Sequence, residues 1–110
     1  MIVNLKINKV DTPMEVDTGA TYTCMSTENY DRVGGSELGP PECQLKTYTG
    51  ELVKPKGTGT VEVEYYCPNF GKQRRKLKVT VVDMKVPTLL GREWLSEIRS
   101  RSSIGINYFQ

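Results

Sequence analysis

Apolar residues recur with a period of two in several segments, and this pattern limits the possible folds more than any other feature of the chain. They occupy every second position of residues 3–7, 61–65 and 77–81, with mostly polar residues between them. Such alternation is typical of strands that bury one face. A helical pattern, with three apolar side chains on one face, is found at residues 92–98. We therefore predict an all-β domain with one short helix near its end.

Turn-forming residues divide the chain into short extended segments. Asp11-Thr12-Pro13 predicts a bend, residues 34–41 a loop, and residues 68–71 the turn of a hairpin. Ser26 is a suitable N-cap for one helical turn that reaches Val33. A length of 110 residues without an internal repeat indicates a single domain, residues 1–110. The other extended segments are predicted at residues 14–16, 21–25, 43–48, 86–90 and 104–108.

Composition excludes several kinds of chemistry. The sequence contains no histidine, so it cannot form a Ser-His-Asp triad, a Cys-His pair or a His-ligated metal site. The three cysteines, Cys24, Cys43 and Cys67, lack the Cys-x-x-Cys spacing of zinc sites, and their odd number indicates a reducing compartment. We expect neither a metal nor another cofactor. Any catalysis must then use carboxylates, hydroxyls, amines or thiols.

Charge and hydropathy give no strong sign of a nucleic-acid or membrane partner. Lys and Arg number 15 and Asp and Glu 13, which leaves a formal net charge of 15 − 13 = +2. The basic run at residues 72–76 is interpreted as a solvated surface, partly offset by Glu62 and Glu64 on the facing strand. No apolar run reaches the ~18 residues that a membrane helix needs. We expect a cytoplasmic protein that binds neither nucleic acid nor membrane.

One carboxylate stands where a buried strand is predicted to end. Residues 17–20 read Asp-Thr-Gly-Ala and directly follow an apolar segment. This motif alone is a weak signal, because aspartate and glycine are common in turns. Its context strengthens it, because a predicted hairpin tip at residues 48–50 and an apolar strand that ends at Gly91, just before the predicted helix, follow in the chain.

In this order and spacing, these features resemble the retropepsins, the aspartic proteases of retroviruses and long-terminal-repeat retrotransposons. The likeness covers residues 2–109, and its most specific part combines residues 16–20 with residues 89–95. Residues 46–51 look most like the Ty3/Gypsy-type branch. The resemblance implies a closed β-barrel, equivalent to one half of an acid protease, with a short C-terminal helix and a flap hairpin. It also implies an aspartic endopeptidase that processes a retroelement polyprotein, with a location within a retroelement particle.

The resemblance assigns roles to particular residues. Asp17 matches the catalytic acid. The turn that supports the dimer axis and leaves space beside the scissile bond is matched by Thr18, Gly19 and Ala20. The tip of the flap hairpin over bound peptide is matched by Tyr48, Thr49 and Gly50. The segment before the helix, which supports the site, is matched by Leu90, Gly91 and Arg92.

The mechanism requires two carboxylates, and one chain offers one. Peptide hydrolysis without a metal or covalent nucleophile can use two carboxyl groups that share a proton. Of the four aspartates, only Asp17 lies in an Asp-Thr-Gly turn, so we predict a C2 homodimer in which Asp17 meets its symmetry mate. The partners are then a second copy and an extended peptide substrate. The alternative is a non-catalytic, domesticated retropepsin-like domain that binds peptides or mediates dimerisation.

Arg92 stands at the start of the predicted helix, where a cation is unfavourable to the helix dipole, so a specific partner is expected. Retroviral enzymes commonly have an acidic residue just after the Asp-Thr-Gly-Ala turn, whereas this chain has Thr21. The sequence therefore leaves the partner of Arg92 open.

Overall fold

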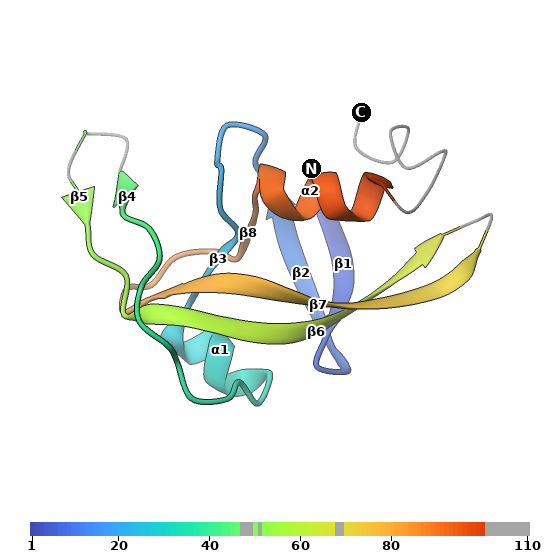
Figure 1. The fold of residues 1–110 in the computed structure, drawn as a ribbon, viewed down its shortest axis with the longest axis horizontal. Coiled ribbons are helices and arrows are strands. Elements are labelled where there is room, and N and C mark those ends of the chain that lie inside the picture. The colour runs from blue at the N-terminus through green and yellow to red at the C-terminus, as the bar shows by residue number, and fades with distance from the viewer. Residues whose placement is uncertain (47–49, 51, 68–69, 101–110) are drawn as a thin grey trace.

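The fold is dominated by strands, as the alternation predicts (Figure 1). The computed structural model describes residues 1–46, 50, 52–67 and 70–100. The predicted strand at residues 104–108 lies outside this part of the chain, as do the first two residues of the predicted turn at residues 68–71. The described elements are β1 (Ile2–Ile7), β2 (Val10–Val16), β3 (Cys24–Ser26), α1 (Thr27–Arg32), β4 (Leu45–Lys46), β5 (Leu52–Val53), β6 (Gly57–Cys67), β7 (Gly71–Val82), β8 (Leu89–Leu90) and α2 (Arg92–Ser100).

Among the described residues, six strands close into a barrel in the order β1-β2-β8-β3-β7-β6, and β6 returns to β1. The longest pairing joins β6 and β7 in an antiparallel ribbon that runs from Gly57 opposite Val81 to Cys67 opposite Gly71. Two pairs are parallel, namely β2 with β8 and β3 with β7. Because β2 and β8 run in the same direction, the residues that follow them, Asp17 and Gly91, emerge at the same edge of the barrel.

The core confirms the predicted faces of the long strands and of the last helix. One face of β6 and β7 points into the barrel, and α2 closes it with Trp94, which is 1% exposed. On β7, Lys72, Arg74, Lys76 and Lys78 lie at every second position and are exposed. The buried apolar side chains include Ile7, Met14, Met25, Tyr30, Val61, Val63, Leu77, Val79, Val81, Leu90, Leu95 and Ile98.

The predicted bend at Asp11, Thr12 and Pro13 is wrong, because these residues lie inside β2 and pair with β1. The chain instead reverses at Asn8 and Lys9, which both have positive φ, of 50° and 69°. Pro13 is tolerated in the strand for a geometric reason. The N–H of Glu15 points toward β8 and donates to the carbonyl of Thr88 at 2.9 Å, so the nitrogen of Pro13 faces the same side, before β8 begins.

The predictions for the shorter elements agree with the structure in position but not in length. The predicted cap is confirmed, because the N–H of Asn29 donates to Ser26 Oγ at 3.1 Å, and the turn that it starts is the six-residue helix α1. A second helix therefore joins the one predicted near the end. The predicted strands at residues 21–25 and 86–90 are shorter, and pair only at Cys24–Ser26 and Leu89–Leu90.

The basic run is partly neutralised, as predicted for Glu64. Lys72 and Arg74 lie 3.8 Å and 3.9 Å from the carboxylate of Glu64, which is 9% exposed. Arg75 pairs with Glu97 of α2. These pairs account for three of the four cations at residues 72–76. The run is therefore part of the charged surface of the barrel, where such pairs contribute little to stability.

Tyr30 packs in a slot where two glycines are required. A Cβ built on Gly35 would lie 2.4 Å from its ring, and one on Gly59 would lie 2.2 Å from its hydroxyl oxygen. The ring is buried, with 3% of its surface exposed. Helix α1 is thus attached to the barrel at a place where β6 has no side chain.

We predict that Gly59→Ala lowers the free energy of unfolding by about 1–3 kcal/mol, because the new methyl group overlaps Tyr30 in a packed core. Urea denaturation measures the change. Thr60→Ala, at the next and exposed position of β6, is the matched control and should change stability by no more than about 0.5 kcal/mol. Equal effects of the two substitutions would contradict the packing described here.

Candidate active site

Asp17 directly follows β2 and begins a tight turn. Its N–H donates to the carbonyl of Leu90 at 3.0 Å, which joins the start of the turn to the end of β8. The N–H of Ala20 donates to the carbonyl of Asp17 at 3.1 Å and closes the turn. The N–H of Gly19 donates to Asp17 Oδ1 at 3.0 Å, so the turn holds its own carboxylate in place.

The turn presents its polar groups at the surface of the single chain. Thr18 and Gly19 are exposed, and Asp17 and Ala20 are half-buried. A Cβ on Gly19 would lie 3.3 Å from Asp17 Oδ1, which is a tight contact. A carboxylate that is fixed on one side and accessible on the other can meet a water, a peptide or a second carboxyl group.

The start of α2 supports the segment that follows this turn. The N–H of Arg92 donates to the carbonyl of Ala20 at 2.9 Å, and the N–H of Glu93 donates to the carbonyl of Thr21 at 3.1 Å. The N–H groups at a helix start have no partner within the helix, and here the active-site loop supplies their acceptors. The structure therefore brings the predicted groups 17–20 and 90–92 together in one cluster.

Arg92 has a partner, and it is the residue that replaces the expected acid. Its Nη2 atom donates to Thr21 Oγ1 at 2.8 Å. The side chain thus bridges from the helix start to the loop through a hydroxyl, where an ion pair would need a carboxylate. The expected specific partner of Arg92 exists, and its chemistry is neutral.

Gly91 is the point of closest approach between α2 and the loop. A Cβ at this position would lie 2.5 Å from the carbonyl carbon of Tyr22 and 2.9 Å from the nitrogen of Thr23. The N–H of Gly91 also donates to Thr23 Oγ1 at 2.9 Å. Leu90, fully buried before it, anchors this segment in the core.

Glu93 belongs to this cluster, although the sequence analysis gave it no role. Its Oε1 accepts a hydrogen bond from the N–H of Thr23 at 2.9 Å. Burial raises the pKa of Glu93 above its ordinary value, more than this hydrogen bond lowers it; nearby Glu42 raises it further and Lys78 lowers it. The glutamate directly after Gly-Arg at the helix start was the available signal.

Two other features lie close to the cluster, a buried thiol and a hydrogen bond between side chains. Burial raises the pKa of the Cys24 thiol, and the negative charge of Asp17 adds to the rise, so this thiol stays protonated at neutral pH. The segment before β8 is attached to α1, since Asn29 Nδ2 donates to Thr88 Oγ1 at 3.2 Å. Asn29 and Thr88 are 59 positions apart, so this contact is too distant in sequence to be predicted.

The predicted flap corresponds to a separate two-stranded sheet of β4 and β5, in which Leu45 pairs with Val53. In Figure 1 this hairpin rises on the same side of the barrel as the β2–β3 connection that carries Asp17. Gly50 is described and has a φ of 87°, a conformation that favours glycine. Tyr48 and Thr49 lie outside the described residues.

In the described part of the chain, no group of three or more Cys, Asp or Glu side chains is placed to hold a metal ion. No helix there is long and apolar enough to cross a membrane.

Solved structures define the class of this fold. The protease of EIAV, in complex with the inhibitor HBY-793, matches with a TM-score of 0.72 and 21% identity, over 88% of this chain and 86% of that chain. A retropepsin-like aspartic protease from Rickettsia conorii matches with a TM-score of 0.58 and 19% identity, over 89% and 68%. The retroviral protease-like domain of Ddi1 from Leishmania major gives 0.58 and 18%, over 90% and 73%. The fold is that of the retropepsin-like proteases.

The sequence agrees with the fold. Residues 3–97 match the family described as "gag-polyprotein putative aspartyl protease". The chain belongs to this family of retropepsin-like aspartic proteases, which confirms the predicted family. A search of curated proteins gives no match.

We predict that Gly91→Ala destabilises the protein by at least about 2 kcal/mol, because the added methyl group overlaps backbone atoms of Tyr22 and Thr23 that no side-chain rotation can move. Urea denaturation is the measurement. Gly39→Ala is the matched control, since a Cβ there would lie at an ordinary 3.6 Å from the carbonyl of Thr58. A Gly91→Ala protein as stable as this control would refute the close approach.

Glu93 predicts a pH dependence of stability. Its pKa in the unfolded chain is about 4.5, and burial raises the pKa in the folded state. The folded protein therefore keeps a proton that the unfolded chain has lost, so this contribution to stability is present below pH 4.5 and is lost as the pH rises through the folded pKa. Glu93→Gln, whose amide oxygen can still accept from Thr23, should remove this part of the dependence.

Unfolding free energies measured between pH 4 and pH 7 test this prediction. The stability of Glu93→Gln relative to the unmodified protein should increase as the pH rises. Glu28→Gln, which removes an exposed carboxylate from the first turn of α1, serves as the control. A stability difference that stays constant across this pH range would show that Glu93 titrates alike in both states.

Proposed function

We propose that this protein is an aspartic endopeptidase that works as a homodimer, with Asp17 of each subunit forming one catalytic pair. The observation that carries the proposal is the geometry of Asp17 in a retropepsin-like fold. Its carboxylate is half-buried, and Oδ1 is held by the N–H of Gly19 in a turn fixed between β2 and α2. Membership of a family of aspartyl proteases supports the same assignment.

The need for a second chain follows from where the other aspartates lie. Asp11 is in β2 and pairs with Lys6, Asp31 is on α1, and Asp83 accepts a hydrogen bond from Thr27 of α1. Each has a place of its own away from the active-site turn. In a C2 dimer the exposed face of the turn meets its own copy, which supplies the second carboxyl group.

In this pair, the two carboxyl groups share one proton, because two negative charges about 3 Å apart are strongly unfavourable. The ionised member takes a proton from a water, which attacks the peptide carbonyl carbon, while the protonated member donates its proton to the carbonyl oxygen. The pair titrates as a unit, so its two apparent pKa values belong to both residues. Activity is expected at mildly acidic pH.

The proposed substrate is an extended peptide, within a polyprotein of the retroelement that encodes the protease. Thr18 is proposed to bond across the dimer axis, and Gly19 and Ala20 leave room for the substrate backbone. The β4–β5 hairpin is proposed to be the flap that covers the peptide and excludes water, with Tyr48, Thr49 and Gly50 as its substrate-binding residues. Processing would take place in the cytoplasm, within the retroelement particle.

We predict that Asp17→Asn lowers peptide cleavage by at least about a hundredfold, because it removes the group that accepts and donates the proton. An unfolded protein substrate at pH 4 to 7, with and without pepstatin, provides the assay. Asp31→Asn, which neutralises an exposed aspartate on α1, is the control and should keep full activity. Unchanged cleavage by a folded Asp17→Asn protein would rule out the proposal.

The dimer can be tested in the same assay by mixing. An excess of Asp17→Asn subunits should inhibit the unmodified protein, because the catalytic pair of a mixed dimer contains a single ionisable carboxyl group. Sedimentation should show a species of twice the chain mass. An unmodified protein that dimerises and binds peptides but never cleaves them would favour the non-catalytic alternative.

A further inference from the structure

The segment that leads into the β4–β5 hairpin crosses one face of the β6–β7 ribbon. We call residues 39–44 the leading arm. At its start, Gly39 and Thr58 exchange two backbone hydrogen bonds, of 2.9 Å and 3.2 Å. A Cβ on the neighbouring Gly57 would lie 2.5 Å from the carbonyl oxygen of Gly39, so the arm lies directly against β6. The hairpin is therefore attached to the ribbon before β4 begins.

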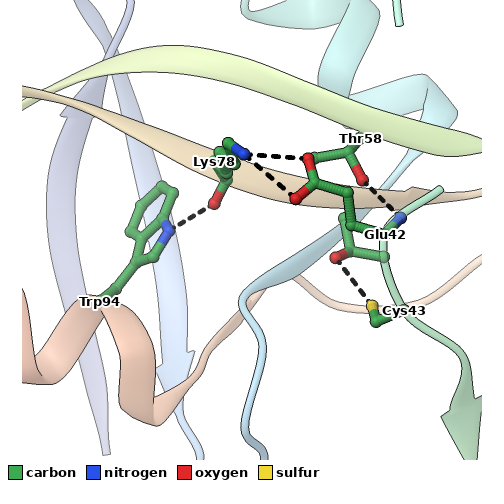
Figure 2. A network of polar contacts seen from close by, with 6 residues as sticks. Glu42, Cys43, Thr58, Lys78 and Trp94 are labelled. Atoms are coloured by element: carbon green, nitrogen blue, oxygen red, sulfur yellow. Dashed lines mark hydrogen bonds and ion pairs between the residues drawn. The ribbon is translucent and has the colours of Figure 1, made fainter. Parts of the chain in front are cut away.

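The middle of the leading arm contacts a pair of threonines that face each other across the ribbon. Thr58 and Thr80 are opposite in register. The N–H of Glu42 donates to Thr58 Oγ1 at 3.2 Å, and Cys43 Sγ lies 3.5 Å from Thr80 Oγ1, with either atom able to donate. Two consecutive residues of the arm are thus bound to two facing positions of the ribbon, one on each strand (Figure 2).

Lys78 adds a charged contact. It lies two residues before Thr80, on the same face of β7. Its Nζ lies 3.1 Å from both carboxylate oxygens of Glu42. Figure 2 shows the lysine side chain reaching to this carboxylate beside Thr58. An ammonium group that donates to both oxygens limits how far the arm can rotate or lift from the strand.

The backbone of the same stretch of β7 holds the active-site side of the molecule. The carbonyl of Lys78 accepts a hydrogen bond from Trp94 Nε1 of α2 at 2.6 Å. The N–H of Thr80 donates to the carbonyl of Thr23, the residue whose hydroxyl binds Gly91, at 2.9 Å. Residues 78–80 therefore hold the leading arm through their side chains and the Asp17 loop with α2 through their backbone.

The far side of the hairpin is attached to the same strand. The N–H of Lys56, between β5 and β6, donates to the carbonyl of Val81 at 2.8 Å. This second attachment is a backbone bond, which substitution of a side chain leaves in place. The Glu42–Lys78 pair is the charged contact of the leading arm described above, and through it side-chain chemistry can change the position of the hairpin relative to Asp17.

We propose that Lys78 is a positioning residue, whose ion pair with Glu42 sets the position of the β4–β5 hairpin relative to the turn around Asp17 and so governs the binding of the peptide substrate. The inference rests on the proposed function, because it assigns the hairpin to substrate binding. Both side chains are mostly exposed, at 64% and 54%, so the pair is worth a modest factor. Its loss should change substrate binding by about two- to fivefold.

The test uses charge reversal on the full chain. Glu42→Lys and Lys78→Glu should each raise KM for a peptide substrate by about two- to fivefold, with kcat changed by less than about twofold. Both should also speed hydrogen exchange of the amides in Leu45–Lys46 and Leu52–Val53. The double variant, which restores an ion pair in the opposite sense, should return KM and exchange toward the original values, and Lys78→Arg should preserve them.

The control is Lys76→Met, which removes an exposed cation two residues earlier on β7. It should change neither KM nor exchange of the hairpin. Lys78→Met, which removes the cation of the ion pair, should raise KM and speed exchange of the hairpin as the reversals do. Effects of the two reversals that add instead of cancelling, or a change in Lys76→Met as large as that in Lys78→Met, would overturn the proposal. Because hydrogen exchange needs no catalysis, it tests the attachment of the hairpin even if the Asp17 variants show that the protein is not a protease.

Discussion

The contact between Gly91 and the peptide that joins Tyr22 to Thr23 is the constraint on which the site depends. A side chain at position 91 would lie within 3 Å of three backbone atoms of that peptide, so the two segments can meet only through glycine. This meeting lets the first N–H groups of α2 reach the carbonyls of Ala20 and Thr21. The parallel pairing of β2 with β8 places Asp17 at the same edge. The active-site turn therefore depends on a residue that contributes no side chain.

The two charged side chains next to Gly91, those of Arg92 and Glu93, each bind a neutral group of the loop. Arg92 is bound to the hydroxyl of Thr21, and the carboxylate of Glu93 accepts from the N–H of Thr23. Residues 18–23, which form the loop after Asp17, contain no acidic side chain, and the acid bound to this loop, Glu93, belongs to α2. The acceptor that Arg92 finds in this loop is a neutral hydroxyl, so this contact between α2 and the loop is a hydrogen bond and not an ion pair.

Much of the fold could be predicted because its signals are local. Period-two alternation indicated β1, β6 and β7, the spacing of Trp94, Leu95 and Ile98 indicated α2, and the residues around Asp17 indicated the turn. The reversal at Asn8 was missed because it is stabilised from a distance: Asn8 Oδ1 accepts from the N–H of Glu62, and its Nδ2 donates to the carbonyl of Val33. Partners that are 54 and 25 residues away leave no pattern in the local sequence. The same reason hid Glu93 and the Glu42–Lys78 pair.

The two parts of the site are held by different kinds of force, and this gives them different responses to ionic strength. The turn around Asp17 is fixed by short hydrogen bonds, most of which have a backbone N–H as donor, and dissolved ions weaken such bonds less than they weaken an exposed ion pair. The leading arm is fixed in part by an exposed ion pair, whose attraction falls as salt shortens the Debye length below its physiological value of about 8 Å. A rise in the salt content of the surroundings would therefore loosen the leading arm and leave the turn around Asp17 in place.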